Sequence, residues 1–297
     1  MGRREPSRVL EIGCGSGLVL EQLAGQWPHA TFLGLDAAAT PTRHNVGDRV
    51  SIKQCLLEEM PPTPPGFDLV FAINVIEHAF DPQRFLAAIV AQLRRTSLCI
   101  LVCPAADPPN TDLLIFDHVH TFTVDALGSV AKKAGIRLLG RFVTDLPIGD
   151  FQVLLLERTE GVAQRENFTL QGPADESAGE TLTRKRADYL SQWARLDAEL
   201  CKRTAAIKHL VAFGAGEIAA LIRSYAPAVW SKIEFLTVDD HYSSRNLGKP
   251  VMVYPKGIDS KETAILLAVN PCNQEGLAAR LRNDRKLPIT WHDLVSR

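Results

Sequence analysis

Apolar runs alternate with stretches of helical periodicity through the first half of the chain. Seven short runs predict β-strands, at Arg8–Ile12, Thr31–Leu35, Val50–Gln54, Asp68–Asn74, Leu98–Cys103, Arg137–Val143 and Phe151–Glu157. Three stretches between them carry apolar residues at helical spacing, at Gly17–Gly25, Asp81–Leu93 and Val124–Ala134. This alternation predicts an α/β fold whose seven-stranded sheet is mostly parallel and is covered by helices on both faces.

The last two of these runs are separated by only a few residues, among them Pro147 and Gly149. So short a connection favours an antiparallel hairpin. We therefore expect one reversed strand at the end of the series.

The second half of the chain begins with a polar stretch and then repeats the alternation on a smaller scale. Residues 161–180 read as a loop or linker. In the charged helix that follows, Tyr189, Trp193, Leu196 and Leu200 form one apolar stripe, which must pack against a partner. Three further runs predict strands, at His209–Phe213, Ile233–Val238 and Ala264–Val269, with helices through Tyr225 and Leu281.

This pattern predicts three parts: a domain over residues 1–160, a linker with a long helix over 161–203, and a small α/β domain over 204–297. Hydrophobic residues make up 46% and charged residues 23% of the chain, as in soluble globular proteins. The formal net charge of −1 argues against nucleic acid as a partner. No apolar run is long enough to span a bilayer, so no membrane partner is expected.

The six cysteines stand in apolar surroundings and include no C-x-x-C pair. We expect most of them to be small core residues in a reducing cytoplasm, and we expect no metal site. A homo-oligomer is left open.

The segment from Glu11 to Gly17, with glycines at 13, 15 and 17, stands where the first strand ends and the first helix begins. Open parallel sheets bind ligands at this position. The spacing G-x-G-x-G differs from the dinucleotide pattern G-x-G-x-x-G, because Leu18 occupies the place of its last small residue. The acidic Glu11 suits a cationic ligand better than a pyrophosphate, and S-adenosylmethionine carries both a sulfonium and an ammonium.

Asp36 ends the second run, where a carboxylate accepts hydrogen bonds from ribose hydroxyls. Together with the glycine turn and the segment from Phe67 to His78, it resembles the class I S-adenosylmethionine-dependent methyltransferases over residues 8–158. The resemblance implies a Rossmann-like sheet with S-adenosylmethionine as cofactor. It also implies the cofactor-binding residues Glu11, Gly13, Cys14, Gly15, Gly17, Asp36 and Asn74.

One position departs from that family. Related enzymes often carry an acidic residue after the third strand that touches the adenine amino group, whereas this chain has Cys55 and Leu56 there. We expect their backbone groups to replace it.

His78, His118 and His120 are the candidate catalytic residues. Histidine removes a proton near neutral pH, which an acceptor nucleophile needs before it attacks the methyl group. If the segment around them is extended, His118 and His120 point to the same side, but these two alone are too few ligands for zinc. The alternatives are a packing or helix-start role for His78 and hydrogen-bonded loop histidines at 118 and 120.

A second glycine turn, Gly214-Ala215-Gly216, lies between a strand and a helix, and Asp239 follows it 23 residues after Gly216. The turn fits the dinucleotide spacing if Ala219 is its last small residue. The predicted unit has too few strands for two mononucleotide-binding halves, which argues against binding of a whole nicotinamide dinucleotide.

A methyltransferase domain, a linking helix and a small Rossmann-like domain that opens with such a turn are similar to the arrangement of sugar C-methyltransferases. That resemblance implies substrate binding by Gly214, Gly216 and Glu217, with a substrate phosphate at the helix N-terminus. The chain begins about seven residues before its first strand and lacks the cysteine-rich zinc segment of those enzymes. Either the sequence is truncated at its N-terminus, or the linker helix or another subunit covers the cofactor instead.

These observations predict a methyltransferase that acts on a small molecule, such as a nucleotide-linked sugar or another biosynthetic intermediate. Two alternatives remain at this stage. One is an NAD-dependent oxidoreductase that uses the Gly214 turn, and the other is a non-catalytic subunit that binds the cofactor to support a partner.

Overall fold

The structure is a computed structural model that describes residues 5–39, 47–143, 151–158, 176–240, 246–258 and 263–295. The chain divides into two compact units. The first unit contains the described residues up to Val143 and the strand at 151–158. The second unit contains the described residues from Glu176 onward, and each unit is described by itself.

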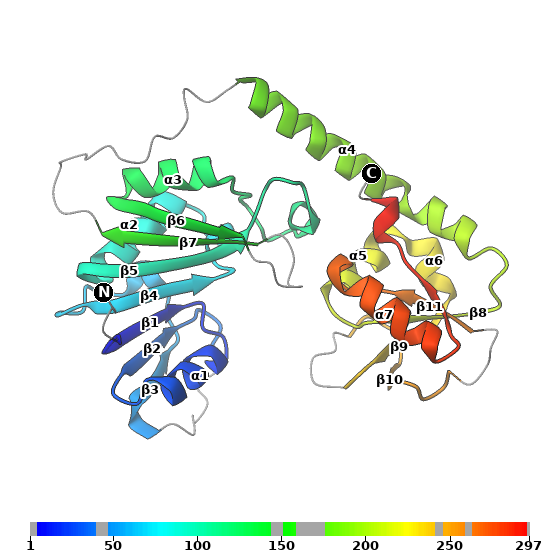
Figure 1. The fold of residues 1–297 in the computed structure, drawn as a ribbon, viewed down its shortest axis with the longest axis horizontal. Helices are drawn as coiled ribbons and strands as arrows, with labels where there is room; N and C mark the ends of the chain where they lie inside the picture. Colours follow the sequence, from blue (N-terminus) through cyan, green and yellow to red (C-terminus); the bar gives the residue numbers. More distant parts are fainter. Residues whose placement is uncertain are drawn as a thin grey trace. The chain divides into compact units, whose positions relative to one another are not determined.

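The first unit is built on one seven-stranded sheet (Figure 1). Its strands are β1 (Arg8–Ile12), β2 (Thr31–Leu35), β3 (Val50–Lys53), β4 (Phe67–Ile73), β5 (Leu93–Pro104), β6 (Ile136–Val143) and β7 (Phe151–Arg158). They lie in the order β3-β2-β1-β4-β5-β7-β6, and only β7 runs antiparallel to its neighbours. The seven predicted strands and the antiparallel pairing of the last two are confirmed.

Helices cover both faces of this sheet because β1 alternates its apolar side chains between them. Val9 joins a core with Leu20 and Ala24 of α1 (Leu18–Gln26), whereas Leu10 joins the larger core with α2 (Pro82–Gln92) and α3 (Val124–Lys133). Four short 3₁₀ helices complete the unit: η1 (Gly47–Arg49), η2 (Leu57–Glu59), η3 (Ile76–His78) and η4 (Thr111–Leu114).

The two longer helices begin at side chains that cap them. The Asp81 carboxylate accepts a hydrogen bond from the Arg84 amide at 3.0 Å, and Pro82 occupies the first helical position. The Thr123 hydroxyl accepts a bond from the Ala126 amide at 3.2 Å. These caps confirm the helix starts that the sequence predicts.

The reversed strand lies inside the sheet, between β5 and β6. This placement buries Gln152 of β7, whose amide nitrogen donates to the carbonyl oxygens of Pro104 and Phe122 at 3.2 and 2.9 Å. Both carbonyls flank the segment that carries His118 and His120. The reversed strand therefore holds that segment at the carboxyl end of β5.

The second unit contains a five-stranded parallel sheet in the order β10-β9-β8-β11-β12. Its strands are β8 (His209–Phe213), β9 (Ile233–Val238), β10 (Val251–Val253), β11 (Thr263–Leu267) and β12 (Leu287–Ile289). Its helices are α4 (Glu176–Arg203), α5 (Glu217–Tyr225), α6 (Pro227–Lys232) and α7 (Pro271–Asn283), followed by η5 (His292–Leu294).

The strand count predicted for this unit was wrong. β10 and β12 have three residues each, too few for a hydrophobic period to stand out in the sequence. With them, the sheet has the order of the first five strands of a Rossmann fold. The argument against dinucleotide binding that rested on too few strands therefore no longer holds.

The apolar stripe on α4 belongs to the core of the second unit. Trp193, Leu196 and Leu200 are fully buried, and the Trp193 ring lies 5.2 Å from that of Trp291 and 5.4 Å from that of Tyr225. Within the stretch predicted as a linker, residues 161–175 lie outside the described residues, and α4 groups with the second unit. No described helix is long and apolar enough to cross a membrane.

Gly214 offers a test of the second unit's packing. Its φ is +115°, and an added Cβ would stand 2.3 Å from the carbonyl oxygen of Ala268. We expect Gly214→Ala to lower the free energy of unfolding by at least about 2 kcal/mol, because it combines backbone strain with a steric clash. Gly216→Ala is the matched control, since its Cβ would meet nothing within 4 Å. Equal unfolding midpoints in denaturant for the two variants would contradict this packing.

Candidate functional site

The first glycine turn is closed by its own backbone. Gly13, Gly15 and Gly17 have φ values of +71°, +52° and +83°, which side chains disfavour. The Gly13 amide donates to the Leu35 carbonyl at 2.7 Å, and the Gly17 amide donates to the Cys14 carbonyl at 2.8 Å. The chain's own backbone hydrogen bonds therefore close the turn.

Asp36 connects this turn to the end of β2. One carboxylate oxygen accepts from the Gly15 amide and the other from the Ala38 amide, both at 2.8 Å. A carboxylate has about four acceptor sites, so two remain for hydroxyl groups of a ligand. An added Cβ at Gly15 would meet nothing within 4 Å, so a ligand has room beside this turn.

Glu11 is a buried carboxyl next to the turn. Only 3% of its surface is exposed, and its Oε2 has no hydrogen-bond partner in the described part of the chain. Burial, with a smaller contribution from the negative charge of Asp36, raises the pKa of Glu11 to about 8. A cation bound here would stabilise the ionised form, so the site favours a positively charged ligand.

The other predicted cofactor residues lie around the same strand ends. The Cys14 side chain is buried, and an added Cβ on Gly34 of β2 would stand 2.5 Å from its sulfur. Asn74 follows β4 with a φ of +55°, and its backbone amide donates to the Val102 carbonyl at 2.8 Å. Beyond β3, Cys55 is half-buried and Leu56 is 51% exposed, so this apolar side chain is available to a ligand.

The structure brings two of the candidate histidines together. The rings of His78 and His118 meet edge to face, with centroids 4.7 Å apart, beside the buried Glu77. The residues around His118 and His120 do not form a strand, so the alternation expected for an extended segment stays a prediction. The ring of His120 lies 5.7 Å from that of Phe122.

Two polar residues of this cluster were missed as site residues. Glu77 stands in the motif after β4, but an acidic residue there does not reveal that its side chain turns inward. Asp112 hydrogen-bonds to Nδ1 of His118 and is 5% exposed. It lies in a connection without apolar periodicity, so no pattern in the sequence marks it.

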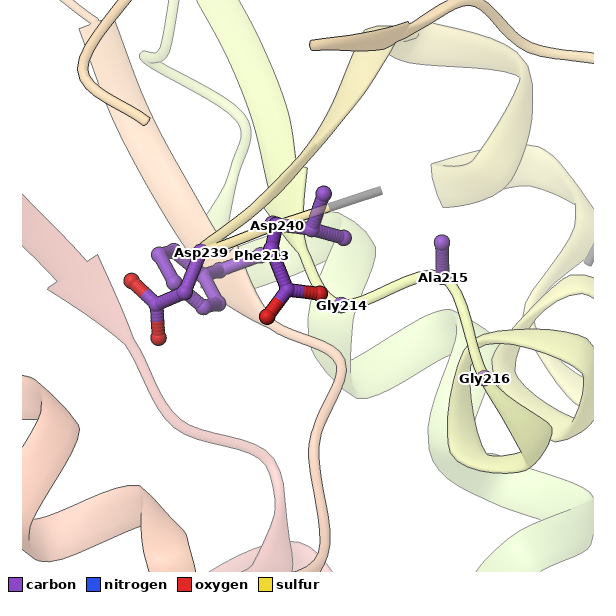
Figure 2. A pocket seen from close by; sticks show the side chains of 7 residues that line it. Phe213, Gly214, Ala215, Gly216, Asp239 and Asp240 are labelled. Carbon is purple, nitrogen blue, oxygen red and sulfur yellow. The ribbon is translucent and has the colours of Figure 1, made fainter. Parts of the chain in front are cut away.

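The second glycine turn lines a cavity of about 230 Å³ within the second unit, together with Phe213 and residues 238–240 (Figure 2). The two carboxylates that face this region, those of Asp239 and Asp240, point in different directions. Asp239 pairs with Arg280 at 2.9 Å.

Backbone groups in this second turn differ in what they offer a ligand. The Gly214 amide already donates to the Thr237 carbonyl at 2.8 Å. Gly216 precedes α5, and Glu217 stands in the first turn of that helix, where backbone amides lack partners within the helix. Of the predicted substrate-binding residues, Gly216 and Glu217 therefore lie at the N-terminus of α5.

The family model that matches this chain falls within the first unit. Residues 2–139 match a family model described as a methyltransferase domain. A probable S-adenosylmethionine-dependent methyltransferase of Mycobacterium tuberculosis is 29% identical over 130 residues, which are 43% of this chain and 47% of that protein. A ubiquinone biosynthesis O-methyltransferase of Azorhizobium caulinodans is 38% identical over 85 residues, 27% of this chain and 33% of that protein.

Among solved structures, the 1,6-didemethyltoxoflavin-N1-methyltransferase of Burkholderia thailandensis, with 1,6-didemethyltoxoflavin and S-adenosylhomocysteine bound, has a TM-score of 0.46 at 19% identity. The match covers 52% of this chain and 72% of that chain. The chain spans less than half the length of each of the two sequence relatives.

The raised pKa of Glu11 predicts a pH-dependent stability. In the unfolded chain this carboxyl titrates near its ordinary value of 4.5, whereas in the folded unit it stays protonated up to about pH 8. The folded state therefore binds more protons in this window, and the free energy of unfolding falls as the pH rises through it. Glu11→Gln mimics the neutral form of this side chain. The free energy of unfolding of this variant should therefore exceed that of the native chain by an amount that grows from about pH 5 to about pH 9.

We expect that advantage to reach roughly 2–4 kcal/mol, since one pKa unit corresponds to about 1.4 kcal/mol and relaxation reduces the full value. Denaturant unfolding of the full chain at both pH values measures it. Glu58→Gln, at an exposed position, is the control. A stability difference between Glu11→Gln and the native chain that does not change with pH would contradict the assigned burial.

Proposed function

We propose that this chain, whose first unit is a class I S-adenosylmethionine-dependent methyltransferase domain, transfers the methyl group of S-adenosylmethionine to a small-molecule acceptor. The observation that carries the proposal is the hydrogen-bonded glycine turn with Asp36 at the carboxyl ends of β1 and β2. The match of residues 2–139 to a methyltransferase domain model supports it.

S-adenosylmethionine is the cofactor of this domain, and the site fits its charges. We assign Asp36 to the ribose hydroxyls, for which its carboxylate keeps free acceptor sites. We assign Glu11 to the cationic methionine part, since a positive charge offsets the cost of burying this carboxylate. Gly13, Cys14, Gly15 and Gly17 would shape the turn, and Asn74, Cys55 and Leu56 would flank the adenosine.

The bound cofactor supplies an electrophilic methyl group. The chain's own residues would hold the acceptor in line with it and exclude water, and such positioning accounts for much of the rate in reactions of this kind. We assign proton removal from the acceptor to the histidines at 78, 118 and 120. His118 supports this role, because the Asp112 carboxylate binds Nδ1 and so fixes which nitrogen keeps the lone pair.

For the acceptor we propose a nucleotide-linked sugar or a related biosynthetic intermediate, held by the second unit. Three features support this: the Rossmann order of its strands, the cavity beside Gly216, and Asp239 directly after β9, where a ribose-binding acid stands in nucleotide-binding folds. Gly214, Gly216 and Glu217 would then mark the phosphate position at the start of α5.

Loss of the Asp36 carboxylate should weaken cofactor binding. Hydrogen bonds to a charged acceptor contribute roughly 1.5–3 kcal/mol each, so Asp36→Ala should reduce the affinity for S-adenosylhomocysteine by at least about tenfold. Isothermal titration calorimetry on the full chain measures this.

Asp36 also holds the Gly15 amide, so a second variant is needed. Asp36→Asn keeps one acceptor oxygen for that amide but removes the charge, and it should show an intermediate loss. NAD serves as a comparison ligand, and its effect on the melting temperature should be the same for both variants as for the native chain. Unchanged affinity in both variants would overturn the assignment of the cofactor site.

Gly216→Val tests the role of the second unit. The φ of Gly216 is −99°, and an added Cβ would meet nothing within 4 Å, so the fold should tolerate valine. The branched side chain would cover the start of α5 and hinder a phosphate there. We expect a raised KM for the acceptor, by about tenfold or more, with S-adenosylhomocysteine affinity nearly unchanged.

Circular dichroism verifies the fold of this variant. Two results would refute the assignment of the second unit to the acceptor: an unaltered acceptor KM, or loss of cofactor binding while the fold is preserved.

A further inference from the structure

Three ligand-type side chains meet at the carboxyl end of β4. Glu77 and His78 belong to η3, and His118 comes from the connection between β5 and α3. One oxygen or nitrogen atom from each lies within 4.8 Å of the others. Atoms bound to one metal ion at about 2.0–2.2 Å stand closer than this, so small side-chain rotations would bring all three to a common ion.

Both histidines have one ring nitrogen engaged by an oxygen acceptor. Nδ1 of His78 lies 2.9 Å from the backbone carbonyl oxygen of Asp117, and Nδ1 of His118 is hydrogen-bonded to the Asp112 carboxylate. Since each acceptor requires a proton on Nδ1, the lone pair of each ring is on Nε2. Metal-binding histidines show this pattern, in which a carbonyl or carboxylate fixes the ring and its tautomer.

The environment of the Glu77 carboxyl indicates that this site binds a ligand. Its residue surface is 1% exposed, and neither carboxylate oxygen has a hydrogen-bond partner among the described residues. An ionised carboxylate that is buried without partners is costly. A protonated carboxyl would still bury a donor and an acceptor without partners, whereas a bound cation would satisfy the charge.

We propose that Glu77, His78 and His118 bind one divalent first-row transition-metal ion. Two imidazoles and one carboxylate form a donor set found with Zn²⁺ in hydrolytic enzymes and with Fe²⁺ in oxygenases. Mg²⁺ and Ca²⁺ prefer oxygen ligands to imidazole nitrogen. Three protein ligands leave coordination positions open for water or for an oxygen atom of a small molecule. Asp112 is a positioning residue, because it acts on the ion through His118.

This proposal departs from the expectation that the chain holds no metal. That expectation considered His118 with His120, which are too few ligands. The structure instead joins His118 to a pair from a distant part of the sequence.

The location connects the ion to the proposed reaction. Val75, two residues before Glu77, packs against Gly13 of the cofactor turn. An ion here would bind an acceptor that offers an oxygen atom. Because the ion would occupy the lone pairs of His78 and His118, these two histidines would not act as bases, and His120 would be left as the candidate base. This role in catalysis rests on the proposed function, whereas binding of the ion does not.

Metal binding is tested on the full chain after treatment with a chelator. Zn²⁺, Fe²⁺, Mn²⁺, Co²⁺ and Mg²⁺ are titrated separately, by calorimetry and by competition with a chromogenic chelator. We expect one equivalent of a transition-metal ion to bind, and Glu77→Gln or His118→Gln to weaken it by at least about 100-fold. His120→Gln is the matched local control and should bind as the native chain does.

Asp112→Asn separates a positioning role from a purely structural one. We expect it to weaken metal binding by about 10- to 100-fold while the melting temperature of the metal-free protein stays nearly unchanged. X-ray absorption of the native chain loaded with the preferred ion should show two imidazole ligands, a readout that does not depend on whether a variant folds.

The outcomes distinguish this proposal from the proposed function. S-adenosylhomocysteine should bind both the metal-free chain and the Glu77→Gln variant. If it fails to bind the native chain, that result contradicts the cofactor site and leaves the metal site untouched. The metal site is overturned if no transition-metal ion binds stoichiometrically. It is also overturned if Glu77→Gln and His118→Gln bind the ion as tightly as the His120→Gln control.

Discussion

Parallel pairing of β1 with β2 on one side and with β4 on the other is the constraint on which the candidate site depends. Ile12 lies opposite Leu35 of β2 and Ala72 of β4. Because parallel strands in this register end at the same level, the glycine turn, Asp36 and the segment after β4 meet although they are far apart in sequence. The bond from the Gly13 amide to the Leu35 carbonyl then fixes the turn against β2.

Uncompensated buried carboxylates concentrate at this same level. Asp68, at the opposite end of β4, accepts hydrogen bonds from Ser7 and Arg8 and pairs with Arg94, as carboxylates that stabilise a fold commonly do. Glu11 and Glu77 each bury at least one oxygen without a donor from the described residues. Such a cost is expected where a ligand supplies the missing charge, because the fold alone gains nothing from it.

A feature of this structure could be predicted from the sequence when the residues that form it lie close together along the chain. The seven strands, the helix starts, the glycine turn and Asp36 depend on local periodicity, capping and turn chemistry, which a single sequence displays. The grouping of Glu77 with His118 depends on a contact across 41 positions, and the strands at 251–253 and 287–289 form because longer neighbours provide pairing partners. The prediction that His118 and His120 share one side assumed an extended segment, and the residues around them form no strand.

The cavity of the second unit differs from the site of the first unit in the charges it presents. Its cavity combines the start of α5, where the helix dipole attracts a phosphate, with two aspartates that repel one. Arg280 offsets one of these charges by pairing with Asp239, and its guanidinium also lies 5.2 Å from the centre of the Phe213 ring. A bare anion gains little in such a cavity. A molecule with a phosphate at one end and hydroxyl donors at the other would satisfy both groups, and the nucleotide-linked acceptor that we propose is of this kind.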